Sequence, residues 1–362
     1  MHLRFVIYGS LTTLTGGYIY DRILVEHLQN RGHRVDIISL PLRNYRRHLL
    51  DNWSPALRAD LAAGPYDLLL QDELNHPSLF HINRSLRKKP RLPIVAVVHQ
   101  VLCRQPRNVL LNRIYQAIEK RYLESVDALI FNSDTTRRTV AALVDDRRPS
   151  IVASPAGNRL GQLPSIDLIG SRARENGPLR LIYVGNLLPQ KGLLPLIKGL
   201  SHLAHEIWHL TVVGSLKMDA RYTRAIKRLI ARRKLSRQIA LAGPKDGNQL
   251  ANLLLQSHVF VMPYSHEAFG MAYLEAMAFG MPVVGSSNGA LKEFVKPGQN
   301  GFLIERDDFE SVNACIHSLY QDRQRLLKMS YAAFRTYKKR PKWRDTMESI
   351  DRFLGDLAGP VR

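Results

Sequence analysis

The chain is poor in cysteine, in long apolar runs and in acidic residues, and each shortage narrows what the protein can be. It has 2 cysteines in 362 residues, Cys103 and Cys315, which lie far apart and form neither a disulfide framework nor a zinc site. No apolar segment approaches the roughly 18 residues that span a bilayer. The N-terminal segment also lacks the long apolar core of a secretory signal, so we expect a cytoplasmic protein.

Acidic residues are outnumbered, since 52 lysines and arginines against 31 aspartates and glutamates give a net charge of +21. The excess is concentrated in two segments. Residues 84–121 contain ten basic residues and one acid, and residues 217–237 contain nine basic residues and one acid. Such fields attract phosphate-rich partners: nucleic acid, anionic lipid or pyrophosphate-linked substrates. For residues 217–237, a solvated helix face is the better explanation. For residues 84–121, a binding surface and a solvated surface are both open.

Short apolar runs alternate with helical patterns, which favours parallel sheets with crossover helices. Six runs begin at residues 3, 34, 66, 93, 127 and 150, and six more begin at 179, 209, 238, 258, 282 and 301. Between the two series, residues 158–178 carry glycine, proline, mixed charge and little apolar periodicity, which indicates a linker. The expected fold class is therefore α/β, with two Rossmann-like, doubly wound domains.

The expected domains cover residues 1–160 and 161–342, followed by an amphipathic helix within 343–362. At 362 residues the chain is too long for one core of typical size. Ligands of doubly wound sheets bind at the carboxyl ends of the strands, so we expect the site there, facing a cleft between the domains.

The most informative segment runs from Ser257 to Gly285 and contains two glutamates eight positions apart. An apolar run to Tyr264 reads as a buried strand, Glu267 follows it, and a helical pattern extends from Gly270 to Gly280. This order directs free backbone N–H groups and the positive end of a helix dipole at a ligand, which suits a diphosphate. Glu275 and Glu267 could each accept hydrogen bonds from a polyol. The combination suits a nucleotide-sugar.

The spacing of these glutamates, the Phe269-Gly270 pair and the Gly-Met-Pro-Val-Val ending resemble the signature of the retaining family 4 glycosyltransferases, or glycosyl transferases group 1, which have the GT-B fold. The resemblance spans essentially the whole chain and is strongest over residues 179–304. It implies two Rossmann-like domains facing a central cleft and a C-terminal helix that crosses back to the first domain. It also implies a hexosyltransferase-type enzyme that moves a sugar from UDP or GDP to an acceptor hydroxyl with retained configuration.

The same resemblance implies roles for the glutamates and for residues of the first domain. Glu267 would bind the hexose, Glu275 the ribose, and the amides of Phe269, Gly270 and Met271 the diphosphate. The glycine pair Gly16 and Gly17, after the first strand, would contact the donor diphosphate and the acceptor. His99 ends the fourth apolar run and would lie near the donor sugar and the acceptor.

The turn from Gly185 to Gly192 resembles the family turn in which an arginine and a lysine straddle the leaving diphosphate. Lys191 matches the lysine, but Asn186 occupies the arginine position. One expected cation is therefore missing. Either another base or backbone amides must neutralise the leaving diphosphate in its place, or the enzyme works without this charge. The predicted catalytic residues are His99, Lys191 and Glu267.

Metal binding is not expected, and no cofactor is expected beside the nucleotide-sugar substrate. The chain contains no Asp-x-Asp pair, by which another glycosyltransferase class holds a metal. The segment His205 to His209 matches the H-E-x-x-H zinc pattern, but its second histidine runs into an apolar strand pattern. Positions four apart in a strand are about 13 Å apart, too far to share a zinc ion.

The acceptor is the least determined part of the prediction. The basic segment 84–121 belongs to the first domain and interleaves with Leu92, Val101, Leu102, Leu110 and Leu111. Such a surface could dock on an anionic bilayer, and a membrane glycolipid or polyprenyl-linked acceptor is favoured.

The membrane candidates are Arg87, Lys88 and Lys89, which would make the protein peripheral on the inner face of the membrane. A soluble sugar or small molecule is the alternative acceptor. A non-catalytic GT-B protein and a nucleic-acid-binding protein are remote alternatives, and no RNA-binding or helix-turn-helix motif is found. The sequence does not give the oligomeric state.

Overall fold

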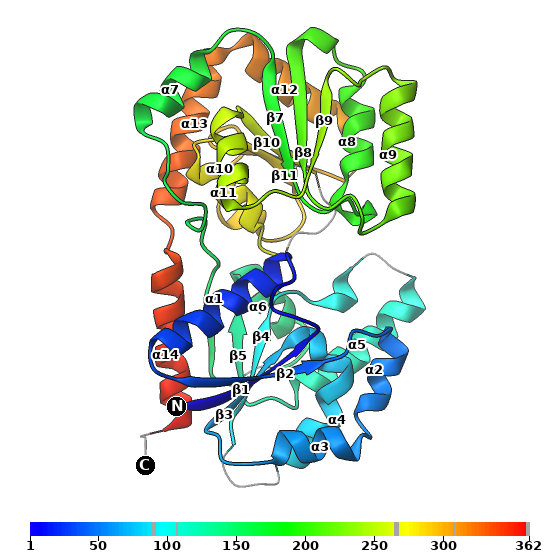
Figure 1. Ribbon diagram of the computed structural model, residues 1–362, viewed down its shortest axis with the longest axis vertical. Coiled ribbons are helices and arrows are strands. Elements are labelled where there is room, and N and C mark those ends of the chain that lie inside the picture. The colour runs from blue at the N-terminus through cyan, green and yellow to red at the C-terminus, as the bar shows by residue number, and fades with distance from the viewer. Residues whose placement is uncertain (88–91, 106–107, 146, 264–267, 307, 360–362) are drawn as a thin grey trace. The chain divides into compact units, whose positions relative to one another are not determined.

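The computed structural model describes the chain except for residues 88–91, 106–107, 146, 264–267, 307 and 360–362 (Figure 1). The chain forms two compact units. The first contains Met1–Pro155 together with the C-terminal segment that starts at Trp343, and the second contains Ala156–Lys342. The change between units falls five residues before the expected boundary at 160, and the C-terminal segment groups with the first unit.

The first unit contains a six-stranded parallel sheet whose order is β2-β1-β3-β4-β5-β6. Its strands are β1 (His2–Tyr8), β2 (Arg34–Leu40), β3 (Leu68–Asp72), β4 (Ile94–Val98), β5 (Ala128–Phe131) and β6 (Ser150–Val152). Its helices are α1 (Gly16–Asn30), α2 (Tyr45–Asp51), α3 (Pro55–Ala62), α4 (His76–Leu86), α5 (Val109–Leu123), α6 (Asp134–Ala141) and α14 (Trp343–Ala358).

The second unit contains another six-stranded parallel sheet, with the order β12-β11-β10-β7-β8-β9. Its strands are β7 (Leu179–Val184), β8 (Trp208–Val213), β9 (Ile239–Gly243), β10 (Val259–Met262), β11 (Val283–Ser286) and β12 (Gly301–Ile304). Its helices are α7 (Ile166–Arg174), α8 (Leu193–Leu200), α9 (Ala220–Arg232), α10 (Gly247–Gln256), α11 (Met271–Ala278), α12 (Phe309–Gln321) and α13 (Arg323–Lys338).

These strands confirm the expected α/β class, because each coincides with one of the twelve apolar runs. The central strands β3, β4, β5 and β10 are buried along their whole length, which explains runs without polar alternation. In each sheet the strand order reverses at one point. This point lies between β1 and β3 in the first unit and between β7 and β10 in the second. Parallel sheets bind ligands at such switch points, beyond the carboxyl ends of the strands.

Helix α14 packs in the first unit, as the fold class predicts. Trp343 lies edge-on against Tyr20 of α1, with 5.7 Å between ring centroids. The hydroxyl of Thr346 donates to the carbonyl oxygen of Ser154 (2.8 Å). At the other end of α1, Asp351 accepts from His33 (2.8 Å). The C-terminal helix is therefore part of the first unit's packing although the second unit separates it in the sequence.

The linker expected over residues 158–178 is wrong for 166–174, which form helix α7. Ile169 and Ala173 are buried on one side of this helix. At Gly170 a Cβ would lie 2.4 Å from the Tyr331 hydroxyl oxygen of α13, so glycine allows the close approach of the two helices. The short length of the helix and its internal glycine concealed its periodicity.

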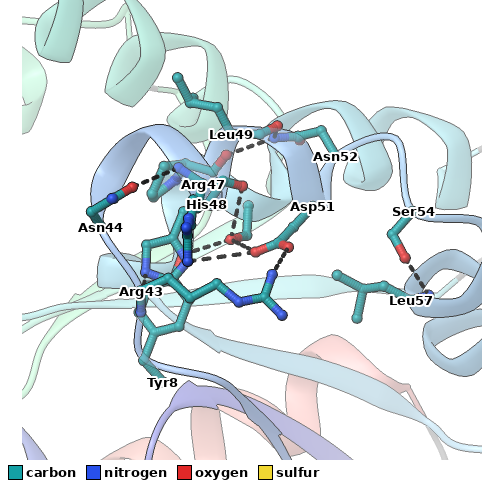
Figure 2. A network of polar contacts seen from close by, with 12 residues as sticks. Tyr8, Arg43, Asn44, Arg47, His48, Leu49, Asp51, Asn52, Ser54 and Leu57 are labelled. Carbon is teal, nitrogen blue, oxygen red and sulfur yellow. Dashed lines mark hydrogen bonds and ion pairs between the residues drawn. The ribbon is translucent and has the colours of Figure 1, made fainter.

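Helix α2 is attached to β1 and α4 by a buried polar network (Figure 2). The hydroxyl groups of Tyr8 and Ser78 are 2.6 Å apart, and Ser78 donates to Asp51 (2.8 Å). Asp51 also accepts from the guanidinium of Arg43 (3.1 Å), as Figure 2 shows. Asn44 caps the helix by accepting from the Arg47 amide. The network fixes α2 beside the carboxyl end of β1.

Candidate active site

The switch point of the first unit brings Gly17 against His99. Helix α1 begins at Gly16, and His99 directly follows β4. A Cβ at Gly17 would lie 3.3 Å from His99 Cδ2, so this glycine leaves room for the imidazole beside the first turn of α1. The structure thus brings together the predicted residues Gly16, Gly17 and His99.

Asp21, in the second turn of α1, is the partner of His99 and was missed by sequence reasoning. The Nε2–H group of His99 donates to Asp21 Oδ1 (2.8 Å), and both side chains are buried. Tyr20 lies edge-on to the imidazole at 5.1 Å. Burial by itself lowers the pKa of His99, but the charges of Asp21, Asp72 and Glu73 and the hydrogen bond to Asp21 raise it to about 9. His99 is therefore held as an imidazolium at neutral pH.

Asn132, at the end of β5, fixes the backbone at His99. Its Nδ2 donates to the carbonyl oxygen of His99 (2.6 Å), and its Oδ1 accepts from Thr136 (2.8 Å). Ser133 caps α6 by accepting from the Thr136 amide. Of these two residues, only Asn132 contacts the His99 segment.

Asp72, at the end of β3, completes a buried acidic group around His99. Burial and the charge of Asp21 raise the pKa of Asp72 to about 7, against the opposing effect of His99. Asp21, Asp72 and His99 lie close enough for one metal ion to be held between them. The Nε2–H group of His99 already donates to Asp21 Oδ1, which favours a proton held between this pair over a metal ion.

A second buried group consists of Glu73, which follows Asp72 in the sequence, His76 and Glu119, and it holds the chain after β4. Glu119 accepts from the amides of Leu102 (2.6 Å) and Cys103 (3.0 Å). His76 Nε2 accepts from the Tyr45 hydroxyl (2.9 Å), and its Nδ1 lies 3.0 Å from the Glu73 carbonyl oxygen. Both imidazole nitrogens are therefore used within the protein, which favours a structural role.

In the second unit, α11 starts at Met271 after Gly270, whose φ of 96° places it in the left-handed region. The N-cap residue Gly270 offers no side chain to cap this helix, and the Tyr273 amide donates to the Gly270 carbonyl oxygen (3.1 Å). Phe269 is buried against Phe294 and lies under the Arg340 guanidinium. The predicted order of strand, glycine and helix is present as expected, while Glu267 lies outside the described residues.

Glu275 is buried in the second turn of α11 with 3% of its surface exposed, and Arg159 is its partner. Arg159 donates from Nε to Glu275 Oε1 (2.5 Å) and from Nη2 to Oε2 (3.2 Å). Burial raises the pKa of Glu275 above its usual value, and Arg159 opposes this shift. Sequence reasoning missed Arg159, which lies 116 positions from Glu275 in the chain.

The turn after β7 holds Gly185, Asn186 and Lys191 beside β8. Asn186 Oδ1 accepts from the Ser215 amide (3.0 Å), so this side chain joins the ends of β7 and β8. A Cβ at Gly214 would lie 2.1 Å from the Gly185 carbonyl oxygen, which shows how closely the two turns cross. Lys191 ends a short 3-10 helix before Gly192. Asn186 therefore has a structural role at the position of the missing arginine.

The membrane candidates are only partly described. Arg87 forms an ion pair with Asp127 (2.9 Å) and donates to the Glu124 carbonyl oxygen, whereas Lys88 and Lys89 lie outside the described residues. Val101 is buried, contrary to its expected place in an exposed surface, because it packs in the core of the first unit. Leu110 is exposed as expected. In the described parts of the chain, no helix has the length and apolar character of a membrane span.

The H-E-x-x-H segment has the predicted conformation. His205 and Glu206 lie in a short 3-10 helix, and Trp208 begins β8, which contains His209. The two imidazoles therefore do not share the face of an α-helix, which the zinc motif requires.

Family models match two parts of the chain. One described as Glycosyltransferase Family 4 matches residues 20–155, and one described as Glycosyl transferases group 1 matches residues 167–336. Glycogen synthase from Mycobacterium tuberculosis is 29% identical over 215 residues, which are 59% of this chain and 50% of that enzyme. The chain thus spans about half the length of that relative. D-inositol 3-phosphate glycosyltransferase from Corynebacterium jeikeium is 24% identical over 94% of this chain and 92% of its own.

Two solved structures share the fold. Sucrose-phosphate synthase from Thermosynechococcus elongatus has a TM-score of 0.82 at 20% identity, and the match covers 98% of both chains. HepE from Anabaena in complex with UDP-glucose has a TM-score of 0.77 at 18% identity and covers 98% of this chain and 99% of its own. At these identities the likeness establishes a common architecture of two parallel sheets.

Proposed function

Since the chain belongs to the family 4 glycosyltransferases with the GT-B fold, we propose that it transfers a sugar from a nucleoside diphosphate to an acceptor hydroxyl with retention of configuration. The observation that carries this proposal is the buried, ion-paired Glu275, placed one turn beyond a helix start that no described side chain caps. Amide groups at a helix start favour a diphosphate. The carboxylate in the next turn favours the hydroxyl groups of the attached ribose.

The donor would bind at the switch point between β7 and β10. The amides at Gly270 and Met271 and the ammonium group of Lys191 would take the diphosphate, and Glu275 the ribose. Glu267 would bind the hexose. UDP-glucose is the first donor to test, because HepE, which shares the fold, was solved with it.

Transfer would proceed on one face of the sugar. The acceptor oxygen forms a bond to the anomeric carbon while the bond from that carbon to the β-phosphate oxygen breaks. The electron pair of the broken bond stays on the diphosphate, and a phosphate oxygen accepts the proton of the acceptor hydroxyl. Lys191 and the α11 dipole would stabilise the charge that develops on the leaving group. In the first unit, His99 would donate a hydrogen bond to a hydroxyl group of the acceptor.

The donor is tested by titrating UDP, GDP, ADP and their glucose or mannose conjugates into the protein in a calorimeter. One nucleoside diphosphate should bind, and its sugar should be consumed when an acceptor is supplied. Proton NMR of the glycoside product reads the anomeric configuration directly. Inversion, or the absence of binding by all these nucleotides, would contradict the proposal.

A lipid acceptor is supported by the exposed start of α5. Val109, Leu110, Leu111 and Ile114 are 43% to 70% exposed in the first two turns of this helix. Tyr115 of α5 stacks on Tyr45 of α2 at 3.9 Å, which joins these turns to helix α2 and its arginines. Exposed aliphatic side chains beside cations fit an anionic bilayer.

The basic residues near these leucines are described by the structure. Exposed arginines lie on α2 and on both sides of the α5 start: Arg46, Arg47, Arg104 and Arg113. Each cation near an anionic bilayer contributes about 1 kcal/mol. This surface is the docking site to test first, because Arg87 already forms an ion pair with Asp127.

Vesicle binding tests the lipid surface. Vesicles with anionic lipid should bind the protein at low salt and release it as salt rises, and Leu110→Ser together with Leu111→Ser should weaken this binding. Arg87→Ser is the matched control and should change it little. Equal binding by the double leucine variant would favour a soluble acceptor. The relative that acts on D-inositol 3-phosphate makes a small phosphorylated polyol the alternative to test.

A further inference from the structure

Glu275 needs a partner because it is buried among apolar neighbours. Its exposed fraction is 3%, and Leu274, Ala276 and Met277 beside it in α11 are fully buried. Burying an ionised carboxylate is costly unless it is paired and hydrogen-bonded. Arg159 supplies two hydrogen bonds from a planar fork, which is the strongest arrangement between these groups.

The chain around Arg159 is shaped to reach α11. At Gly157 a Cβ would lie 2.7 Å from the Leu274 carbonyl oxygen and 3.2 Å from the Glu275 nitrogen, so glycine lets the segment lie on the helix backbone. Leu160, next to Arg159, is buried in the core of the second unit. Arg159 is therefore held between two packed residues, and its side chain remains 29% exposed.

The geometry points to Arg159 as a positioning residue of the donor site, which holds Glu275 so that each carboxylate oxygen directs its second lone pair at one hydroxyl of a vicinal diol. This inference rests on the proposed function. Arg159 donates one hydrogen bond to Oε1 of Glu275 and one to Oε2. A carboxylate oxygen accepts two hydrogen bonds, so two acceptor sites remain. Two adjacent ribose hydroxyls offer two donors at a matching spacing.

Stability alone does not explain this pair. A buried ion pair is often no more stabilising than apolar residues of similar volume. The same unit shows how an arginine is used structurally: Arg172, which is 3% exposed, donates to carbonyl oxygens at the ends of α10 and α11, including Leu254 and Phe279. Arg159 instead orients a carboxylate, which is a group that a ligand can share.

Ionisation of Glu275 gives the inference a second readout. Arg159 is the charged group that faces this carboxylate. Helix α13 and strand β11 pack against α11, and among the described residues their buried side chains carry no charge. The buried ionisable side chains nearby are Tyr337 of α13 and Tyr273 of α11. Removing Arg159 therefore leaves burial unopposed, and Glu275 would take up a proton at a higher pH. Ribose binding would then weaken as the pH falls.

The test compares nucleoside diphosphates with their 2′-deoxy analogues by calorimetry. The wild-type protein should bind the ribose form about ten-fold or more tightly than the deoxy form, since a lost hydrogen bond to a charged group has that effect. Arg159→Ala should reduce this ratio to about two and make binding of the ribose form weaker at pH 6 than at pH 9. Arg344→Ala, which removes the exposed Arg344–Glu348 pair (2.7 Å), is the control and should change neither value.

A second variant keeps the inference testable if Arg159→Ala does not fold. Arg159→Lys retains the charge but offers one point donor in place of the fork. It should keep the flat pH profile and lose part of the preference for the ribose form. A wild-type preference in either folded variant, or tighter binding by Arg159→Ala, would overturn the inference. Absence of nucleotide binding by the wild-type protein would instead contradict the proposed function.

Discussion

The two units each bury a carboxylate in the second turn of a helix that starts beside a glycine, but they pair it with different bases. Asp21 in α1 is bonded to His99, and Glu275 in α11 is bonded to Arg159. An imidazolium loses its proton within the range of pH that proteins tolerate, whereas a guanidinium does not. The charge of the first pair can therefore change with pH, whereas the second pair holds a fixed positive charge on Arg159. This difference suits hydroxyl chemistry in one unit and nucleotide binding in the other.

The largest expected effect comes from breaking the second pair at its carboxylate. Glu275→Gln keeps the shape but removes the charge that ribose hydroxyls would share. Hydrogen bonds to charged groups contribute roughly 1.5–3 kcal/mol each, so nucleotide affinity should fall about ten-fold or more. The melting temperature should stay within a few degrees, because Arg159 is 29% exposed and regains water.

Calorimetry with the nucleoside diphosphate that the wild-type protein binds measures this change. Glu348→Gln, which breaks the exposed pair with Arg344, is the matched control and should leave affinity unaltered. Unchanged affinity in Glu275→Gln would remove the central element of the donor site.

Breaking the first pair should act through pH. Asp21 and neighbouring acids raise the pKa of His99 to about 9, against burial, while an unfolded histidine has a pKa near 6.5. The stabilisation is therefore complete below about pH 6.5 and is lost as the pH rises through about 9. Asp21→Asn should lower the pKa of His99 and reduce stability at neutral pH by on the order of 1–3 kcal/mol.

Histidine titration by NMR and urea unfolding at several pH values measure both effects. Asp36→Asn is the control, since the His2–Asp36 pair (2.7 Å) is partly exposed and should contribute little. A His99 titration that stays near pH 9 in Asp21→Asn would show that this carboxylate does not set its charge.

The fold could be predicted from the sequence because a buried parallel strand leaves an unmistakable apolar run. Each of the twelve runs became a strand, and the helix start at Gly270 follows from the glycine before an apolar pattern. The partners of the site could not be predicted. Asp21 and Arg159 are charged residues, for which a surface position is the usual expectation. Their roles depend on partners that lie 78 and 116 positions away in the sequence.

The second pair can also be disturbed without touching its charges, with a smaller effect. Gly157→Ala would place a Cβ 2.7 Å from the Leu274 carbonyl oxygen, so the segment must move away from α11. We expect a loss of about 1–2 kcal/mol in unfolding free energy and weaker nucleotide binding. Gly247→Ala, at the start of α10, meets no atom within 4 Å and should be neutral in both measurements. Equal behaviour of the two variants would show that Arg159 does not depend on this close packing.

The smallest expected effect tests whether the first pair holds a proton or a metal. Asp21, Asp72 and His99 lie close enough to share a metal ion, while the Arg159–Glu275 pair has no such capacity. Because His99 donates its Nε2 proton to Asp21, we expect activity and melting temperature to survive dialysis against EDTA, with no stoichiometric zinc by elemental analysis. Asp21→Asn treated in the same way is the control for any loss caused by the chelator itself. If EDTA abolishes the activity of the wild-type protein and Mg²⁺ or Mn²⁺ restores it, then Asp21, Asp72 and His99 hold a metal ion and not a shared proton. This result would also move the neutralisation of the leaving diphosphate away from Lys191 and the α11 dipole.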